Sequence, residues 1–335
     1  IFMGTTAFLI AEFLEVSYGT VVIAAIVPAA LYYLVLFLQV DAIAKKNGLH
    51  GIPKEDLPKL FAVMLSGWLF MIPLAVLLYF LFWLGFNPAL SAIYAIAALF
   101  ILMIIKQRAL PTRTEWGSFV FGSGENLLSI ILIGGGAGLV IGILNSTGLG
   151  FQLALLLSSV GNLLLMLILT ALVSIVLGMG MPTAAVYIVL SIVLAPAMSK
   201  MGVEPMAAHL FLFYFGLLSM LTPPVAVASY VAAGLAGSNM WATGMIGMQL
   251  AATAYLLPFL WVYNPALLFV GSLQASIYVI GSAIVAAFML ARAVLDIGGE
   301  AKIKGCIYFV AAFAVGGSTV WFGQISSLVL VATAL

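Results

Sequence analysis

Two short segments rich in glycine, proline and hydroxyl groups interrupt apolar stretches of the chain, and they are its best candidates for binding chemistry. The first runs from Gly178 to Thr183 and the second from Ser219 to Pro224. Such clusters do not continue a regular helix, so each predicts a helix break. A break leaves carbonyls and amides without helical partners, and lipid tolerates such groups only where they face a cavity or bind something.

If the two breaks meet within the membrane, they offer complementary ligands. Helix ends carry partial charge, positive at the amino end and negative at the carboxyl end. Carbonyl and hydroxyl oxygens suit a hard cation such as Na⁺, and helix amino ends suit a carboxylate. For either break alone, the alternative is a proline kink stabilised by its neighbours. The predicted binding residues are Gly178, Gly180, Pro182, Thr183, Ser219, Thr222, Pro223 and Pro224, with Na⁺ assigned to Gly178, Thr183, Ser219 and Thr222.

The composition predicts that most of the chain lies in lipid. Of the 335 residues, 65% are hydrophobic and only 6% are charged, whereas soluble domains carry about 25% charged residues. Apolar runs such as Leu60–Leu84 are long enough for a membrane-spanning helix and lack the alternation of a barrel strand. The net charge of +1 suggests no nucleic-acid partner, and Cys306, the single cysteine, is expected to be a buried or lipid-facing thiol. We therefore predict an all-α integral membrane protein.

Polar stretches at Asp41–Lys59, Lys106–Glu125 and Arg292–Lys304 separate the apolar segments. Their lysines and arginines place these stretches on the cytoplasmic side by the positive-inside rule. Gly161–Met198 is interpreted as a re-entrant hairpin, with two full spans as an alternative that fits the charges equally well. Met206–Ala236 is then a crossing helix broken in its middle. Spans are predicted at Ser17–Val40, Leu60–Leu84, Pro88–Ile105, Leu127–Leu144, Met240–Tyr263, Ser272–Ala291 and Cys306–Leu330.

Ile1–Val40 and Val225–Tyr263 share one layout: an apolar half-helix, a short polar break and a long span with an internal proline. If they correspond, the chain begins just after a missing copy of the second break, and a first hairpin is missing too. Gly4, Thr5 and Thr6 would then occupy the matching place and join the predicted binding residues, with plain packing as the alternative. Inverted repeats with paired broken helices are typical of secondary transporters.

The predicted organisation has four parts. Residues 1–40 end a truncated first repeat, and residues 41–126 hold cytoplasmic loops and two linking spans. Residues 127–268 form the second repeat with its hairpin and broken helix, and residues 269–335 add C-terminal spans.

Ionisable side chains are almost absent from the predicted spans. His209 is the exception, and we expect a satisfied neutral histidine, with a gating or proton-carrying role as the alternative. Glu12 and Glu15 are expected to be solvated or to meet another subunit. A membrane enzyme needs a catalytic cluster such as HExxH, and a channel needs charged rings or a filter repeat. The sequence has neither pattern, so we expect neither an enzyme nor a channel.

Residues around the breaks carry a family resemblance. The segments that carry it are Gly178–Ala185, Ala207–Phe211, Phe213–Gly216 and Leu221–Ala226, with Gly4–Glu12 and Val40–Pro58 in support. Together they resemble the large membrane subunit of TRAP transporters, in particular the DctM-like fused-permease type that works with TAXI-class binding proteins. The resemblance runs from Ile1 to about Leu268.

The resemblance implies an elevator-type carrier with inverted repeats and two hairpins in the bacterial inner membrane. It implies Na⁺-coupled import of carboxylates that a periplasmic TAXI-type binding protein delivers, with a small four-helix subunit or its fused equivalent as partner. The hairpin tip and the second break would line one region for Na⁺ and substrate. No cofactor other than Na⁺ is expected, and the chain would be a fragment that lacks the first hairpin. A related elevator-type carrier that needs no binding protein is the alternative.

Overall fold

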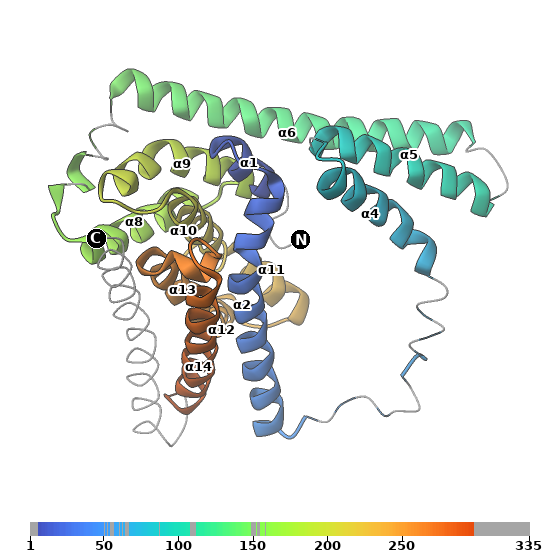
Figure 1. Ribbon diagram of the computed structural model, residues 1–335. Helices are drawn as coiled ribbons and strands as arrows, with labels where there is room; N and C mark the ends of the chain where they lie inside the picture. Colours follow the sequence, from blue (N-terminus) through green and yellow to red (C-terminus); the bar gives the residue numbers. More distant parts are fainter. Residues whose placement is uncertain are drawn as a thin grey trace. The chain divides into compact units, whose positions relative to one another are not determined.

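The computed structural model describes residues 6–297, apart from residues 50, 52, 54–56, 60, 62, 64–66, 87, 108–111, 149–151, 153–154 and 158. Within this part of the chain every regular element is a helix (Figure 1), as the composition predicts. The chain divides into two compact units, one made of Ile1–Gly48 with Gly136–Leu335 and the other of Leu49–Gly135. Gly4, Thr5 and the predicted span with Cys306 lie outside the described residues.

The smaller unit consists of apolar helices that pack through aromatic rings. A 3₁₀ turn leads into α4 (Met71–Leu78), which continues as a π-helical turn and is followed by α5 (Pro88–Gln107). The rings of Phe80 and Tyr94 stack with centroids 4.3 Å apart, which holds the two helical segments together. α5 matches the span predicted from Pro88.

Helix α6 (Arg113–Thr147) begins earlier than the sequence analysis expected. The Glu115 carboxylate accepts the Thr112 N–H at 2.7 Å, and the Thr112 hydroxyl accepts the Glu115 N–H at 3.3 Å. This reciprocal capping box satisfies free amides of the first turn. The second polar stretch is therefore helical from Arg113 onward, and the predicted cytoplasmic loop is wrong in that part.

In the larger unit, the amino-terminal helices reproduce the layout of half-helix, break and long span. α1 (Thr6–Phe13) ends in a turn where Glu15 takes a left-handed φ of 54°, and α2 (Tyr18–Lys46) follows. The Ser17 hydroxyl caps α2 by accepting the Thr20 N–H at 3.2 Å. Lys45, in the last turn, pairs with Asp41 at 2.7 Å and suits the negative end of the helix dipole.

Two helices joined by a short break lie where the re-entrant hairpin was predicted, and a helix interrupted between Leu218 and Val227 lies where the broken helix was predicted. Asn162 caps α8, and Glu204 caps α10 by accepting the Ala207 N–H at 2.7 Å. A left-handed Gly237 ends α11, as glycine often does at a helix carboxyl end. The helices of this half are α8 (Leu163–Gly178), α9 (Thr183–Lys200), α10 (Pro205–Leu218), α11 (Val227–Ala236), α12 (Met240–Leu250), α13 (Ala252–Tyr263) and α14 (Leu273–Ile297).

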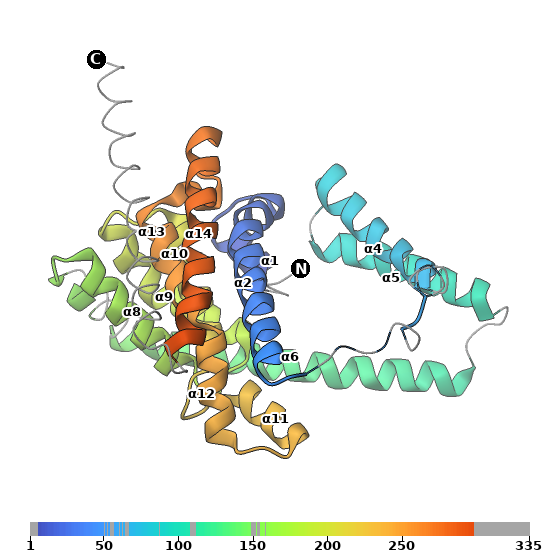
Figure 2. The ribbon, with the colours of Figure 1, turned by 90° about the horizontal axis from the view of Figure 1, so that it is seen from below.

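Helix α10 lies at the centre of the core, in contact with α8, α9 and α13. Leu210, Phe211 and Leu212 are fully buried. Because Gly216 has no side chain, α9 approaches closely: a Cβ at Gly216 would lie 2.7 Å from Val186 Cγ1. α2 packs along α14 on the other side of the unit (Figures 1 and 2).

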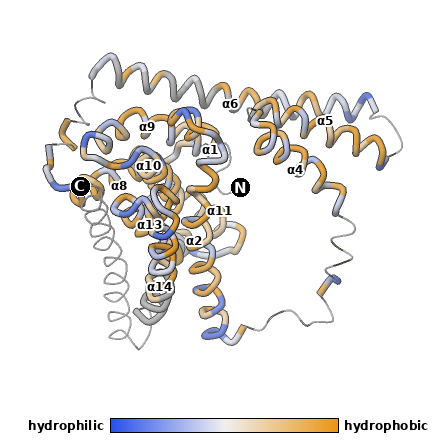
Figure 3. The backbone as a smooth tube through the Cα atoms, in the orientation of Figure 1, coloured by the Kyte–Doolittle hydropathy of each residue, from blue (hydrophilic) through white to orange (hydrophobic). Residues whose placement is uncertain are grey.

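Apolar side chains also cover the outside of the helices. Leu235 is 87% exposed and Phe37 is 69% exposed, which would be costly in water and suits lipid. Figure 3 shows hydrophobic residues along the helices and hydrophilic ones at ends such as that of α2. Among the described residues, four helices are long and apolar enough to cross a membrane, namely Tyr18–Lys46, Ala89–Lys106, Thr183–Lys200 and Met240–Tyr263. The last of them turns at Ala251, which separates α12 from α13.

Candidate functional site

The hairpin tip is built from glycine and proline, as its sequence predicts. Gly180 has a φ of +78°, in the left-handed region that favours glycine. Pro182 is extended and its carbonyl accepts the Val186 N–H at 3.0 Å, so α9 begins at Thr183. No side chain caps this helix start. Free amides of the first turn of α9 are therefore available to an acceptor.

The second break begins where α10 ends. The Ser219 hydroxyl is buried and donates to the Gly216 carbonyl at 2.6 Å. The Thr222 hydroxyl donates to the Leu218 carbonyl at 2.6 Å, so two hydroxyls cover the last carbonyls of the helix. The backbone becomes helical again only at Val227, after the two prolines.

The two predicted breaks meet at Gly178 and Ser219. A Cβ at Gly178 would lie 2.7 Å from Ser219 Oγ and 3.0 Å from the Gly216 carbonyl oxygen. The carboxyl ends of α8 and α10 therefore lie against each other, each with the partial negative charge of a helix end. Gly180 has open space where a Cβ would stand. The two predicted break segments are therefore in contact at this point, while their binding role stays a prediction.

The other residues of the second break bind to different helices. Thr222 Oγ1 lies 2.6 Å from the Tyr255 hydroxyl of α13, in a hydrogen bond. A Cβ at Gly244 of α12 would lie 3.0 Å from Pro223, and the Tyr230 hydroxyl of α11 donates to the Pro224 carbonyl at 2.7 Å. The break is thus held by α11, α12 and α13, while its Ser219 end faces the hairpin.

Thr6 and Ser174 carry buried hydroxyls that have no hydrogen-bond partner within the described residues. Thr6, predicted from the repeat, begins α1 and is 1% exposed, and its Oγ1 has no hydrogen bond within the described residues. Ser174 Oγ is likewise buried and without a partner in this part of the chain. Ser174 lies one turn before Gly178 and shares its helix face. Sequence reasoning missed Ser174, although its four-residue spacing from the glycine was a signal.

His209 is buried and hydrogen-bonded. Its Nδ1 lies 2.6 Å from the Tyr187 hydroxyl of α9. Phe13 of α1 places its ring centroid 5.9 Å from that of Tyr187, edge to face. This confirms the expected satisfied histidine, which joins α9 to α10. Glu12, in the last turn of α1, and Glu15, in the turn that follows, are exposed, which agrees both with a solvated position and with contact to another subunit.

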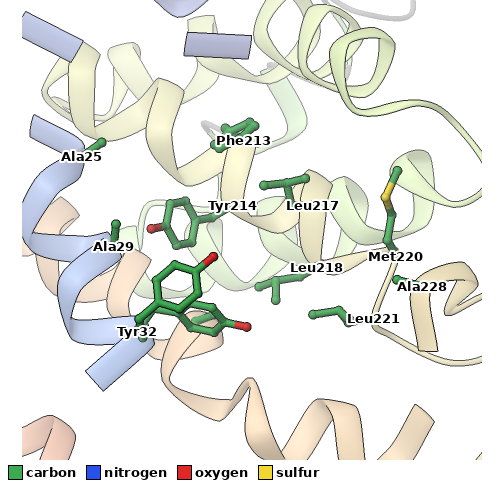
Figure 4. Close-up of a pocket in the computed structure, with 12 residues that line it drawn as sticks. Ala25, Ala29, Tyr32, Phe213, Tyr214, Leu217, Leu218, Met220, Leu221 and Ala228 are labelled. Atoms are coloured by element: carbon green, nitrogen blue, oxygen red, sulfur yellow. The ribbon is translucent and has the colours of Figure 1, made fainter. Parts of the chain in front are cut away.

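A pocket of about 290 Å³ lies beside the second break, between α2, α10, α11 and α13 (Figure 4). Its polar groups are the hydroxyls of Tyr32, Tyr33 and Tyr214, and its other walls are apolar. The sequence analysis did not predict it, because the walls come from helices far apart in the chain. The remaining lining residues are Ala25, Ala29, Phe213, Leu217, Leu218, Met220, Leu221, Ala228 and Ala254.

The fold and these breaks define a multi-pass α-helical membrane protein. A family model described as the DctM component of the tripartite ATP-independent periplasmic transporters matches residues 2–276. The chain therefore belongs to this family and is a TRAP transporter membrane subunit, as the motifs around Gly178 and Thr222 suggested. This is a transporter family and not an enzyme family. The searches of curated proteins and of solved structures return no match.

Proposed function

We propose that the chain is the membrane carrier of a Na⁺-coupled importer of small organic anions, carboxylates above all. It works in the bacterial inner membrane and receives its substrate from a periplasmic binding protein of the TAXI type. A small four-helix subunit, or its fused equivalent, completes the complex. The observation that carries the proposal is the contact of Gly178 with Ser219, where two helix carboxyl ends meet.

The charges of the helix ends support this assignment. Two carboxyl ends with oxygen ligands favour a cation, while the uncapped amino end of α9 favours the carboxylate. Na⁺ would be held at Gly178 and Ser219, with Thr183 and Thr222 as further ligands. The unpartnered Ser174 hydroxyl is close enough along α8 to contribute as well. Within the described residues no three His, Cys, Asp or Glu side chains gather into a metal site.

The negative partial charges of the two helix carboxyl ends would couple Na⁺ transport to carboxylate transport. The two carboxyl ends repel an anion until a cation neutralises them, so Na⁺ strengthens carboxylate binding and is carried with it. The hairpin α8–α9 and the broken helix α10–α11 would move together across the membrane as the elevator part of the carrier. Their shared core at Gly216 and Val186 supports movement as one body.

Uptake by the complete transporter tests the proposal. The transporter is reconstituted in liposomes with its candidate binding protein, and labelled carboxylate uptake is measured with and without a Na⁺ gradient. Thr222→Val should raise the Na⁺ concentration for half-maximal uptake by at least about tenfold, because a polar contact with a charge contributes about 1.5–3 kcal/mol. Thr222→Ser keeps the hydroxyl and should behave like the natural chain. Uptake that does not depend on Na⁺ would contradict the proposed coupling. Equal Na⁺ dependence of the two variants would show that Thr222 is not part of the site.

A further inference from the structure

We propose that the pocket beside the second break holds the carbon skeleton of the transported anion and selects monocarboxylates with an apolar or aromatic body. The inference rests on the proposed function and adds the substrate class to it.

The pocket adjoins the residues that form the second break. Leu218, Met220 and Leu221 line it, and they flank Ser219, which faces the hairpin. The Leu218 carbonyl is also the acceptor of the Thr222 hydroxyl. A carboxylate held at this break would therefore have the pocket beside it, on the side toward α2 and α13.

The lining favours apolar groups. Among the lining residues none carries a charge, and Ala25, Ala29 and Ala228 leave room for a ligand. A second carboxylate, or the hydroxyls of a sugar acid, would lose hydration without enough partners, and that is costly. In Figure 4 Tyr32 from α2 and Tyr214 from α10 lie next to each other in the lining of the pocket. Their hydroxyls can bind one polar group, such as the oxo group of a 2-oxo acid.

The size of the pocket limits the ligand. About 290 Å³ is at the lower end of ligand sites, which run from about 300 to 1,000 Å³. A branched aliphatic chain or a phenyl ring fits this space, whereas a lipid tail is too long for it. The tyrosine hydroxyls also favour a partly polar ligand over a hydrocarbon chain.

Direct binding to the purified membrane transporter is the test, without the binding protein, whose own selectivity would otherwise be measured. The probes are phenylpyruvate and 4-methyl-2-oxopentanoate, with succinate and gluconate as polar competitors and pyruvate as a short acid that does not reach the pocket. Titrations are made by calorimetry with and without Na⁺. The apolar 2-oxo acids should bind at least about tenfold more tightly than succinate or gluconate.

Two substitutions test the pocket itself, one that fills it and one that enlarges it. Ala29→Phe fills it and should weaken binding of the two larger acids by at least about tenfold, with pyruvate changed by less than about twofold. Ala30→Phe, at the next and exposed position of α2, is the matched control and should change neither. Leu217→Ala enlarges the pocket and should shift preference toward acids with a bulkier ring.

The outcomes separate this inference from the proposed function. Na⁺-dependent binding that favours succinate, or pocket variants that leave the order of acids unchanged, would overturn the pocket assignment alone. Displacement of the probes by a long-chain fatty acid without Na⁺ would mark a lipid site and overturn it too. If no carboxylate bound at any Na⁺ concentration, the proposed function and the inference would both fall.

Discussion

At Gly178 the lack of a side chain lets the end of α8 lie against the end of α10. The position where its Cβ would stand is 2.7 Å from Ser219 Oγ, closer than real Cβ atoms come to their neighbours. Ser219 is itself held by its bond to the Gly216 carbonyl, so neither side yields easily. The width of the candidate ion site is thus set by one missing methyl group.

Gly178→Ala should therefore destabilise the protein by about 1–3 kcal/mol, the usual effect of overpacking a tight core. It should also weaken Na⁺ binding, because the tip of the hairpin has to move away from Ser219. Thermal unfolding in detergent, with and without Na⁺, measures both effects. Gly234→Ala is the control, since nothing lies within 4 Å of a Cβ there. Equal melting temperatures and equal Na⁺ shifts for the two variants would contradict the close contact.

Single residues could be predicted where their type alone carries the signal. Gly178 and Thr183 were predictable because glycine and proline interrupt a helix in any surroundings. Ser174 and Tyr214 were not, because a buried hydroxyl becomes informative only when its neighbours are known. Those neighbours come from helices that the sequence does not pair.

At the level of elements, α9 and α10 are joined by a polar contact within an apolar core. The Tyr187 hydroxyl and His209 Nδ1 are 2.6 Å apart and buried. In such surroundings a polar atom without a partner is costly. The pair therefore fixes how the returning arm of the hairpin lies on the broken helix.

Tyr187→Phe should lower the free energy of unfolding by about 1–3 kcal/mol, because it leaves His209 Nδ1 without its partner. Tyr263→Phe, in the same unit, removes no interhelical hydrogen bond of the described residues and should change it by less than about 0.5 kcal/mol. Thermal unfolding of both purified variants measures this difference in stability. A Tyr187→Phe variant as stable as the control would show that the pair is energetically neutral.

The hairpin and the broken helix were predictable as elements, and two boundaries were not. α9 begins at Thr183, where the proline before it predicted a helix start. α6 begins at Arg113 because Thr112 and Glu115 cap it, a signal hidden among charges that suggested a loop. The turn at Ala251 contains neither glycine nor proline, so the sequence carries no signal for it.

For the whole molecule, composition predicts a membrane protein but not which surfaces pack. On α2, Val21 and Val35 are buried while Ile23 and Phe37 are exposed. All four are apolar, because a face toward lipid and a face toward the core need the same kind of side chain. Helical periodicity therefore cannot separate them, and the packing of α2 along α14 could not be predicted.

The orientation of α2 can be predicted from charge. Lys45 and Lys46 end the helix, so the positive-inside rule predicts that this end lies in the cytoplasm and that the turn before Tyr18 faces the outside. In a Cys306→Ser background, Val16→Cys should react with a membrane-impermeant maleimide in intact cells. Leu49→Cys, which is 66% exposed, should react only after the membrane is opened. The Cys306→Ser protein alone is the control for unspecific labelling. The reverse labelling pattern would show that α2 has the opposite orientation in the membrane.

The missing side chain at Gly216 has a consequence for how this carrier can change. Val186 and Leu190 of α9 occupy the space that a Cβ there would need. Any larger residue at position 216 would force α9 and α10 apart. Ser219 lies only one turn after Gly216. If the proposed ion site is correct, a substitution at position 216 should change its ion preference by moving α10, although no proposed ligand residue is altered.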